Sequence, residues 1–157
     1  MSESARPALD AASIEVEAES GAPAGFRARY AQLGPLLGAE LLGAAVYELD
    51  PGERTGPYHY EVGNEECLLV LAGTPTLRHP EGRDVLEAGD MVMFPDGEVG
   101  AHQVINESSE VARVLIFSTM RVPFGCVYPD SGKVSTFAGV FPVGATVDYW
   151  DGESADA

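Results

Sequence analysis

Lysine is almost absent from this chain of 157 residues, because Lys133 is its single lysine and lysine and arginine together number nine. Aspartate and glutamate number 25, which gives a formal net charge of -16. A surface this poor in cations repels nucleic-acid phosphates and the anionic head groups of membranes. We therefore expect no nucleic-acid partner and no membrane partner.

Long apolar runs are also missing, since no stretch approaches the roughly 18 apolar residues of a membrane-spanning helix. The first 20 residues have neither a basic start nor an apolar core, so no secretory signal is expected and the protein is predicted to be cytoplasmic. The two cysteines, Cys67 and Cys126, are expected to be reduced thiols in such a chain.

Glycine and proline, by contrast, number 18 and 11 and favour many short strands over a few long helices. Between residues 44 and 118, segments of strand character alternate with turn sequences, which predicts about eight strands in roughly 75 residues. These strands are expected at 44–49, 58–61, 66–72, 74–79, 83–88, 91–94, 101–106 and 111–118. The spacing is typical of an all-β sandwich or barrel.

The length allows one domain with a proper core. We expect this domain at residues 25–150, with its barrel core at 44–118. Residues 1–24 read as an acidic, partly disordered leader that contributes at most a peripheral strand, and residues 151–157 read as a disordered acidic tail. The alternation of apolar and arginine residues at 26–30 predicts one further, half-exposed strand.

The strand expected at 66–71 is apolar on both alternating faces, so its outer face needs a cover. A terminal extension or a second subunit could provide this cover, and apolar side chains between Val134 and Trp150 are available for it. Residues 128–133 read as a surface loop, with a lid over the site as the alternative.

Potential metal ligands are concentrated in one part of the chain. His59 and Glu61 are two residues apart, so on a strand both side chains leave by the same face. Glu66 follows across a short turn on the expected antiparallel neighbour, and His102 begins a later strand. Two imidazoles with one or two carboxylates suit Fe(II), Mn(II), Ni(II) or Zn(II).

The order of these residues resembles the two motifs of the cupin superfamily. The first motif is matched by Gly52, the sequence Pro-Tyr-His-Tyr-Glu, Glu66 and Gly73, and the second by Gly89, Pro95, Gly97, His102 and Asn106. Two positions depart from the pattern: Glu61 replaces the second histidine, and four residues instead of two separate Gly97 from His102.

The resemblance implies a double-stranded β-helix, the cupin jelly-roll barrel, with N- and C-terminal extensions packing on it and with a homodimer as the expected assembly. It also implies that His59, Glu66 and His102 bind one divalent transition metal, with Glu61 in the place of a third imidazole. Asn106 is expected to make a turn or a structural hydrogen bond. Glu66 is preferred over Glu65 because it keeps the interval to Gly73 and shares the inward face of Leu68 and Val70.

Glu61 leaves two alternatives open. As a fourth ligand it would reduce the charge of the centre and favour Mn or Fe over Cu. If it swings away, the remaining two histidines and one carboxylate form the set found in non-haem iron oxygenases. A third interpretation is that these polar residues are only hydrogen-bonded and hydrated, although buried carboxylates and imidazoles without a neutralising cation are costly.

Four further residues are candidates for a small-molecule pocket: Tyr47, Glu65, Met93 and Arg113. Core packing is the alternative for Tyr47 and Met93, and a structural salt bridge is the alternative for Arg113. His79 in a turn is expected to be exposed.

Three functions remain open from the sequence. The first is an Fe- or Mn-dependent oxygenase or an isomerase-like enzyme with a small-molecule substrate. The second is a binding protein that senses a small metabolite, and the third is a structural barrel with incidental metal or none.

Overall fold

The computed structural model describes residues 8–18, 20–144 and 146–151. Within these ranges the chain forms thirteen strands, one short α-helix and two 3-10 turns. In chain order they are β1 (Glu17–Ala18), β2 (Arg29–Gln32), α1 (Gly34–Leu37), β3 (Leu42–Leu49), β4 (Tyr60–Val62), β5 (Glu66–Ala72), β6 (Thr76–His79), β7 (Gly82–Val85), β8 (Met91–Phe94), η1 (Glu98–Gly100), β9 (Gln103–Ile105), β10 (Ala112–Thr119), β11 (Gly125–Tyr128), η2 (Pro129–Ser131), β12 (Lys133–Thr136) and β13 (Gly139–Pro142). No helix in the described part of the chain has the length and apolar character that crossing a membrane requires.

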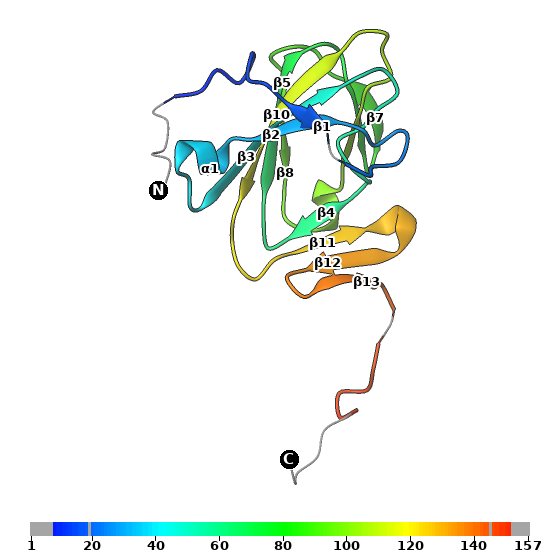
Figure 1. The fold of residues 1–157 in the computed structure, drawn as a ribbon. Helices are drawn as coiled ribbons and strands as arrows, with labels where there is room; N and C mark the ends of the chain where they lie inside the picture. Colours follow the sequence, from blue (N-terminus) through cyan, green and yellow to red (C-terminus); the bar gives the residue numbers. More distant parts are fainter. Residues whose placement is uncertain (1–7, 19, 145, 152–157) are drawn as a thin grey trace.

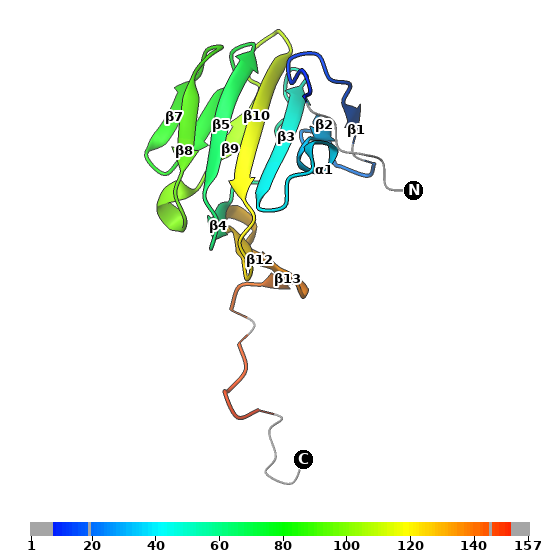
Figure 2. The same ribbon diagram turned by 90° about the vertical axis from the view of Figure 1, so that its left-hand side faces the viewer.

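The strands form three antiparallel sheets. The largest has the order β1-β2-β3-β10-β5-β8, and the other two have the orders β13-β12-β11-β4 and β7-β6-β9. Figure 2 shows β3, β10, β5 and β8 of the largest sheet side by side, and Figure 1 shows β11, β12 and β13 at one end of the molecule. This architecture confirms the all-β prediction.

All eight strands predicted between residues 44 and 118 are present, with bounds that differ by a few residues. The strand predicted at 26–30 was placed too early, because the Phe26 N–H closes a turn on the Pro23 carbonyl and β2 begins only at Arg29. The segment from Tyr128 to Lys133 connects β11 to β12 through η2, and Asp130 within it is held by the Arg78 guanidinium.

One apolar core fills the space between the sheets. Leu68 and Val70 of β5 point into it, as the sequence pattern predicted, together with Val104 of β9 and Val114 of β10. Its buried members are Ala28, Leu49, Leu68, Val70, Leu77, Leu86, Phe94, Val104, Ala112 and Val114. Burial of these side chains fixes the inward face of β5, on which Glu66 also lies, because side chains alternate along a strand.

A second apolar cluster covers the outer face of the largest sheet. Leu69 and Leu71 of β5 pack there beside Leu115 of β10, and residues of the segment before β1 lie over them. The cover comes from Leu9, Ala11, Ile14 and Val16, with Ala31 and Leu33. Of the candidates that the sequence left open, the N-terminal extension provides this cover, whereas β12 and β13 extend the sheet of β11 and β4.

The two motif residues Gly73 and Asn106 hold turns of the barrel. Gly73 has a φ of 77°, and a Cβ there would lie 2.6 Å from the carbonyl oxygen of Val111, so only glycine fits. The buried Asn106 side chain donates to the carbonyls of Leu49 and Glu110 at 2.8 and 2.7 Å. Asn106 therefore makes a structural hydrogen bond, as the resemblance implied.

Candidate metal centre

His59 and His102 face each other across a backbone bridge. The His59 N–H donates to the His102 carbonyl at 3.1 Å, and the His102 N–H donates to the His59 carbonyl at 2.8 Å. This pairing places the two imidazole centroids 4.7 Å apart. The two histidines, 43 positions apart in the numbering, therefore belong to one site.

Glu66, the first residue of β5, points between the two imidazoles. Its Oε2 atom lies 3.7 Å from His59 Nε2 and 3.5 Å from His102 Nε2. The same oxygen is buried and has no hydrogen-bond partner. A buried carboxylate oxygen is normally hydrogen-bonded or bound to a cation, so its environment here lacks a positive partner.

The backbone fixes the orientation of both imidazoles. His59 Nδ1 lies 2.8 Å from the Pro57 carbonyl oxygen, and His102 Nδ1 lies 2.9 Å from the Gly100 carbonyl oxygen. Because a carbonyl only accepts, each Nδ1 carries the proton and each Nε2 presents its lone pair towards Glu66. Histidine ligands of metals are commonly oriented in this way by their second nitrogen.

The extra residues between Gly97 and His102 form the turn η1. Gly100 in this turn packs on the backbone of Pro95 so closely that a Cβ would lie 1.9 Å from the Pro95 carbonyl oxygen. The turn thus contains the additional residues, and both His102 and the Gly100 carbonyl that orients it still lie in the site. The departure from the cupin spacing does not move His102 out of the site.

Burial and charge act differently on the two histidines. His102 is nearly inaccessible, and burial together with the neighbouring His59 lowers its pKa to about 4. For His59 burial also lowers the pKa, but the neighbouring Glu66 carboxylate and the Pro57 carbonyl outweigh it and raise the pKa above its ordinary value. His102 is therefore a neutral ligand over the whole physiological range.

Glu61 lies beside this group on β4, where its cross-strand partner is Cys126 of β11. Its Oε2 atom is buried without a hydrogen-bond partner, as that of Glu66 is. Burial and the nearby charge of Glu66 raise the pKa of Glu61. Potential ligand atoms of His59, Glu61 and Cys126 all lie within 4.8 Å of one another, and so do those of His59, Glu66 and His102.

The residues present fit a divalent metal ion. Two imidazole nitrogens and one carboxylate oxygen converge, and the two buried side-chain oxygens without a hydrogen-bond partner in the described residues belong to Glu61 and Glu66. A transition-metal ion would satisfy the lone pairs that the protein leaves open there. His59, Glu66 and His102 would hold it, with Glu61 next to them.

Cys126 is the site residue that the sequence analysis missed, because none of the predicted strands contains it. The structure places it on β11, 8% exposed, opposite Glu61. Burial raises the pKa of its thiol to about 12. The pairing of β4 with β11, which joins segments some 65 residues apart, brings this thiol to the site. No local sequence pattern indicates that pairing.

The four expected pocket residues do not join the metal group. Glu65 is exposed, and Met93 is 60% exposed on the strand position next to the inward-facing Phe94. Tyr47 packs against the inner core and stacks on Tyr30, with ring centroids 6.0 Å apart.

Arg113 makes a structural salt bridge, which the sequence analysis gave as the alternative to a pocket role. It points to the outer face of the sheet, where its guanidinium donates to Glu48 at 2.6 Å and to the carbonyls of Ala11 and Ile14. It therefore anchors the N-terminal segment and does not serve as a pocket cation.

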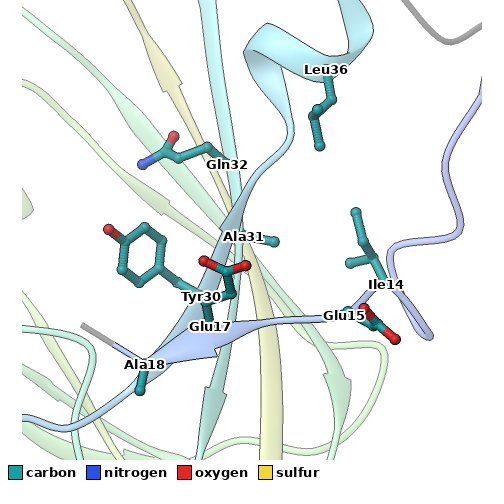
Figure 3. Close-up of a pocket in the computed structure, with 8 residues that line it drawn as sticks. All are labelled: Ile14, Glu15, Glu17, Ala18, Tyr30, Ala31, Gln32 and Leu36. Atoms are coloured by element: carbon teal, nitrogen blue, oxygen red, sulfur yellow. The ribbon is translucent and has the colours of Figure 1, made fainter. Parts of the chain in front are cut away.

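Three hollows in the surface are lined by residues other than those of the metal group. Figure 3 shows one of about 700 Å³ between the N-terminal segment and β2, lined by Ile14, Glu15, Glu17, Ala18, Tyr30, Ala31, Gln32 and Leu36. A second, of about 660 Å³, includes Pro57, Tyr58 and Gln103 in its lining, next to His59 and His102 in the chain. A third hollow, of about 380 Å³, has Met93, Phe94, Gly100 and Ala101 in its lining and so also adjoins the backbone that carries His102.

The fold and the convergent histidines and glutamates together define a small β-barrel with a group of residues that could hold a metal ion. The family model of the cupin domain matches residues 45–118. Residues 45–118 therefore form a cupin domain, and its barrel is a double-stranded β-helix. No curated protein matches the chain in sequence.

Solved structures resemble the chain over most of its length. A sugar phosphate isomerase from a cupin superfamily, from Silicibacter pomeroyi, is 26% identical and covers 96% of this chain and 98% of its own, with a TM-score of 0.75. The polyketide cyclase RemF of Streptomyces resistomycificus is 20% identical and covers 74% of this chain and 82% of its own, with a TM-score of 0.60. A predicted oxalate decarboxylase of Thermotoga maritima is 20% identical and covers 73% of this chain and 99% of its own, with a TM-score of 0.60. The last two comparisons support the fold alone.

Proposed function

We propose that the protein is a metal-dependent isomerase that acts on a small hydroxycarbonyl compound of the sugar or sugar phosphate class. The observation that carries the proposal is the unpartnered Glu66 Oε2 atom, which faces the Nε2 atoms of His59 and His102. The similarity to the isomerase from Silicibacter pomeroyi over nearly the full length of both chains supports the substrate class.

The chemistry of such an isomerisation suits this group of residues. A proton moves from the carbon beside a carbonyl to the carbonyl carbon, while a hydroxyl proton moves between the two oxygens. A bound divalent ion would polarise the carbonyl oxygen and lower the barrier to proton removal. The Glu61 carboxylate, buried beside His59 with an unpartnered oxygen, takes the proton from one carbon and returns it to the next.

An oxygenase is the second candidate, because His59, Glu66 and His102 alone supply the two histidines and one carboxylate that Fe(II) oxygenases use. In that case Glu61 has no part in proton transfer. The two enzymes differ in their need for dioxygen and in the exchange of a carbon-bound proton with solvent. A metabolite-binding protein without turnover would show neither.

The test begins with metal analysis of protein purified without added metal and after reconstitution with Fe(II), Mn(II), Ni(II) or Zn(II). Each form is then incubated in D2O with a panel of aldose and ketose phosphates under nitrogen, and deuterium incorporation is followed by NMR. We expect incorporation at the carbon beside the carbonyl, lost in Glu61→Gln and Glu66→Gln and kept in Glu65→Gln, which makes the same change at the exposed neighbour. Saturable binding without exchange, or turnover that requires dioxygen, would overturn the isomerase proposal.

A homodimer is proposed as the working assembly. Its support is the apolar surface of the C-terminal hairpin, where Phe137 is 84%, Val140 60% and Phe141 45% exposed. Apolar side chains gathered at one sheet edge are typical of an interface. Sedimentation of the wild type and of Phe137→Ser tests the assembly, and a wild-type monomer at micromolar concentration would contradict it.

A further inference from the structure

The side chains of β4 and β11 place a thiol next to the histidines. Cys126 and Glu61 are directly opposite each other in the ladder, so both side chains leave the same face of this sheet. Tyr128, two positions further along β11, lies over His59 with ring centroids 6.0 Å apart. This face therefore presents sulfur, oxygen and nitrogen ligand atoms together.

The resulting group differs in chemistry from the one built on Glu66. His59, Glu66 and His102 offer two nitrogens and an oxygen, whereas His59, Glu61 and Cys126 offer a nitrogen, an oxygen and a sulfur. Soft thiolate ligands select thiophilic ions, and carboxylates with imidazoles suit Mn(II) and Fe(II). The two groups are thus expected to prefer different ions.

His59 belongs to both groups, and it has one nitrogen to give. Its Nδ1 atom lies 2.8 Å from the Pro57 carbonyl, so only Nε2 is open to an ion. A nitrogen lone pair binds one metal at a time. Occupation of one position therefore withdraws His59 from the other.

We propose that His59, Glu61 and Cys126 form a second, overlapping metal position that takes thiophilic divalent ions such as Zn²⁺ and Cd²⁺ and competes with the ion held by His59, Glu66 and His102. The thiol releases its proton to solvent when the ion binds and becomes a thiolate ligand. The competition rests on the proposed function, in which the other position holds the working metal. The sulfur position itself stands without it.

The experiment uses the full chain, freed of metal with a chelator and kept under a phosphine reductant. Cd²⁺ is titrated while the ultraviolet sulfur-to-cadmium charge-transfer band is recorded, and Mn²⁺ binding is followed separately by the loss of the free-ion EPR signal. We expect the band in the wild type and in Cys67→Ser, where the other free thiol is removed, and its loss in Cys126→Ser and Cys126→Ala. Absence of the band in the wild type, or its persistence in both Cys126 variants, would overturn the proposal.

Three further arms separate the two positions. His102→Ala should lose Mn²⁺ binding and keep the cadmium band, and His59→Ala should lose both. Cys126→Ser should keep Mn²⁺ binding, which also shows that this variant is folded.

In the wild type added Cd²⁺ should release bound Mn²⁺, and in Cys126→Ser this release should be abolished. A cadmium band without any Mn²⁺ binding would refute Mn²⁺ as the working metal of the proposed isomerase and leave the sulfur position standing. Simultaneous binding of both ions would refute the competition.

Discussion

The imidazole of His102 lies flat on the ring of Phe94, with centroids 3.6 Å apart and planes 6° apart. Phe94 ends β8 and belongs to the inner core, so the ring is held by packing. One face of the imidazole is therefore fixed by Phe94, while Nδ1 is fixed by the Gly100 carbonyl. Together these contacts aim His102 Nε2 at Glu66 before any ion arrives.

Replacing Phe94 by a smaller side chain should weaken metal binding strongly while lowering the stability of the fold only modestly. Phe94→Leu is expected to cost about 1–2 kcal/mol of unfolding free energy, because it leaves a small cavity beside His102. Metal affinity should fall by about tenfold, since the imidazole loses one of its two orienting contacts. Urea unfolding and metal titration measure the two effects. Phe117→Leu in the outer cluster is the control and should leave metal affinity unchanged.

The two site histidines should titrate far apart in the metal-free protein. The chain has three histidines, so their ring proton signals can be followed individually by NMR and assigned with His59→Gln and His102→Gln. We expect a pKa of about 4 for His102, because of burial and the neighbouring His59, and a pKa above the ordinary value for His59. The reverse order would show that the charge of Glu66 outweighs burial at His102 and not at His59.

The depressed pKa of His102 has a consequence for stability. In the unfolded chain this histidine takes up a proton near pH 6.5, whereas in the folded protein it does so only near pH 4. Its contribution is therefore complete above pH 6.5 and is lost as the pH falls through this window. At about 1.4 kcal/mol per pKa unit the loss approaches about 3 kcal/mol. Metal-free wild type should lose about that much more unfolding free energy than His102→Gln between pH 6.5 and 4, and parallel curves would contradict the prediction.

Glu61 should strengthen metal binding and lower the unfolding free energy of the metal-free protein. Its folded pKa is raised by burial and by Glu66, so its contribution is present at low pH and lost as the pH rises through the folded value. At pH 8, Glu61→Gln should therefore raise the unfolding free energy of the metal-free protein by up to about 1 kcal/mol. Denaturation in the presence of a chelator measures this gain.

The same substitution should lower metal affinity, because a charged oxygen next to the ion is lost. Glu61→His should instead shift preference from Mn²⁺ towards Ni²⁺ and Zn²⁺ by at least about tenfold, since it supplies an imidazole. Glu65→Gln, which removes a charge at an exposed site, should change neither property. Equal metal preference in wild type and Glu61→His would show that residue 61 lies outside the coordination sphere.

The strands of the barrel were predictable because each carries its own signal. Residues 66–72 are apolar and bounded by turn residues, and the period of two correctly put Glu66 on the inward face with Leu68 and Val70. His59 and His102 were brought into one group by a family resemblance, and the backbone bridge between them accounts for that grouping physically. Glu65 was separated from Glu66 by the same alternation.

The strand ladder β4-β11 could not be predicted in the same way. These two strands are joined by a long-range pairing, so Cys126 and Glu61 meet without any shared local pattern. The segment at 8–16 packs on the sheet without forming a strand, so it shows no periodicity although Leu9 and Ile14 pack against the outer cluster. Arg113 anchors that segment, and the sequence did not indicate this role because the segment itself shows no pattern.

Arg113 should matter for stability and not for the metal. Its guanidinium joins Glu48 to the carbonyls of Ala11 and Ile14, and its side chain is 10% exposed. Arg113→Met removes these bonds, but Glu48 keeps Arg29 as a partner at 2.8 Å, so the expected cost is about 2–3 kcal/mol rather than that of an isolated buried charge.

Unfolding of Arg113→Met should begin at the N-terminal segment, because that segment loses its polar anchor while its apolar contacts remain. Limited proteolysis should therefore cut Arg113→Met within residues 8–18 at protease levels that leave the wild type intact. Arg83→Met, which breaks the exposed pair with Glu107, is the control and should cost less than about 1 kcal/mol. Cd²⁺ and Mn²⁺ affinities should be the same in all three proteins, because Arg113 lies on the opposite side of the sheet from Glu66. A change in either affinity with unaltered proteolysis would place Arg113 in the site after all.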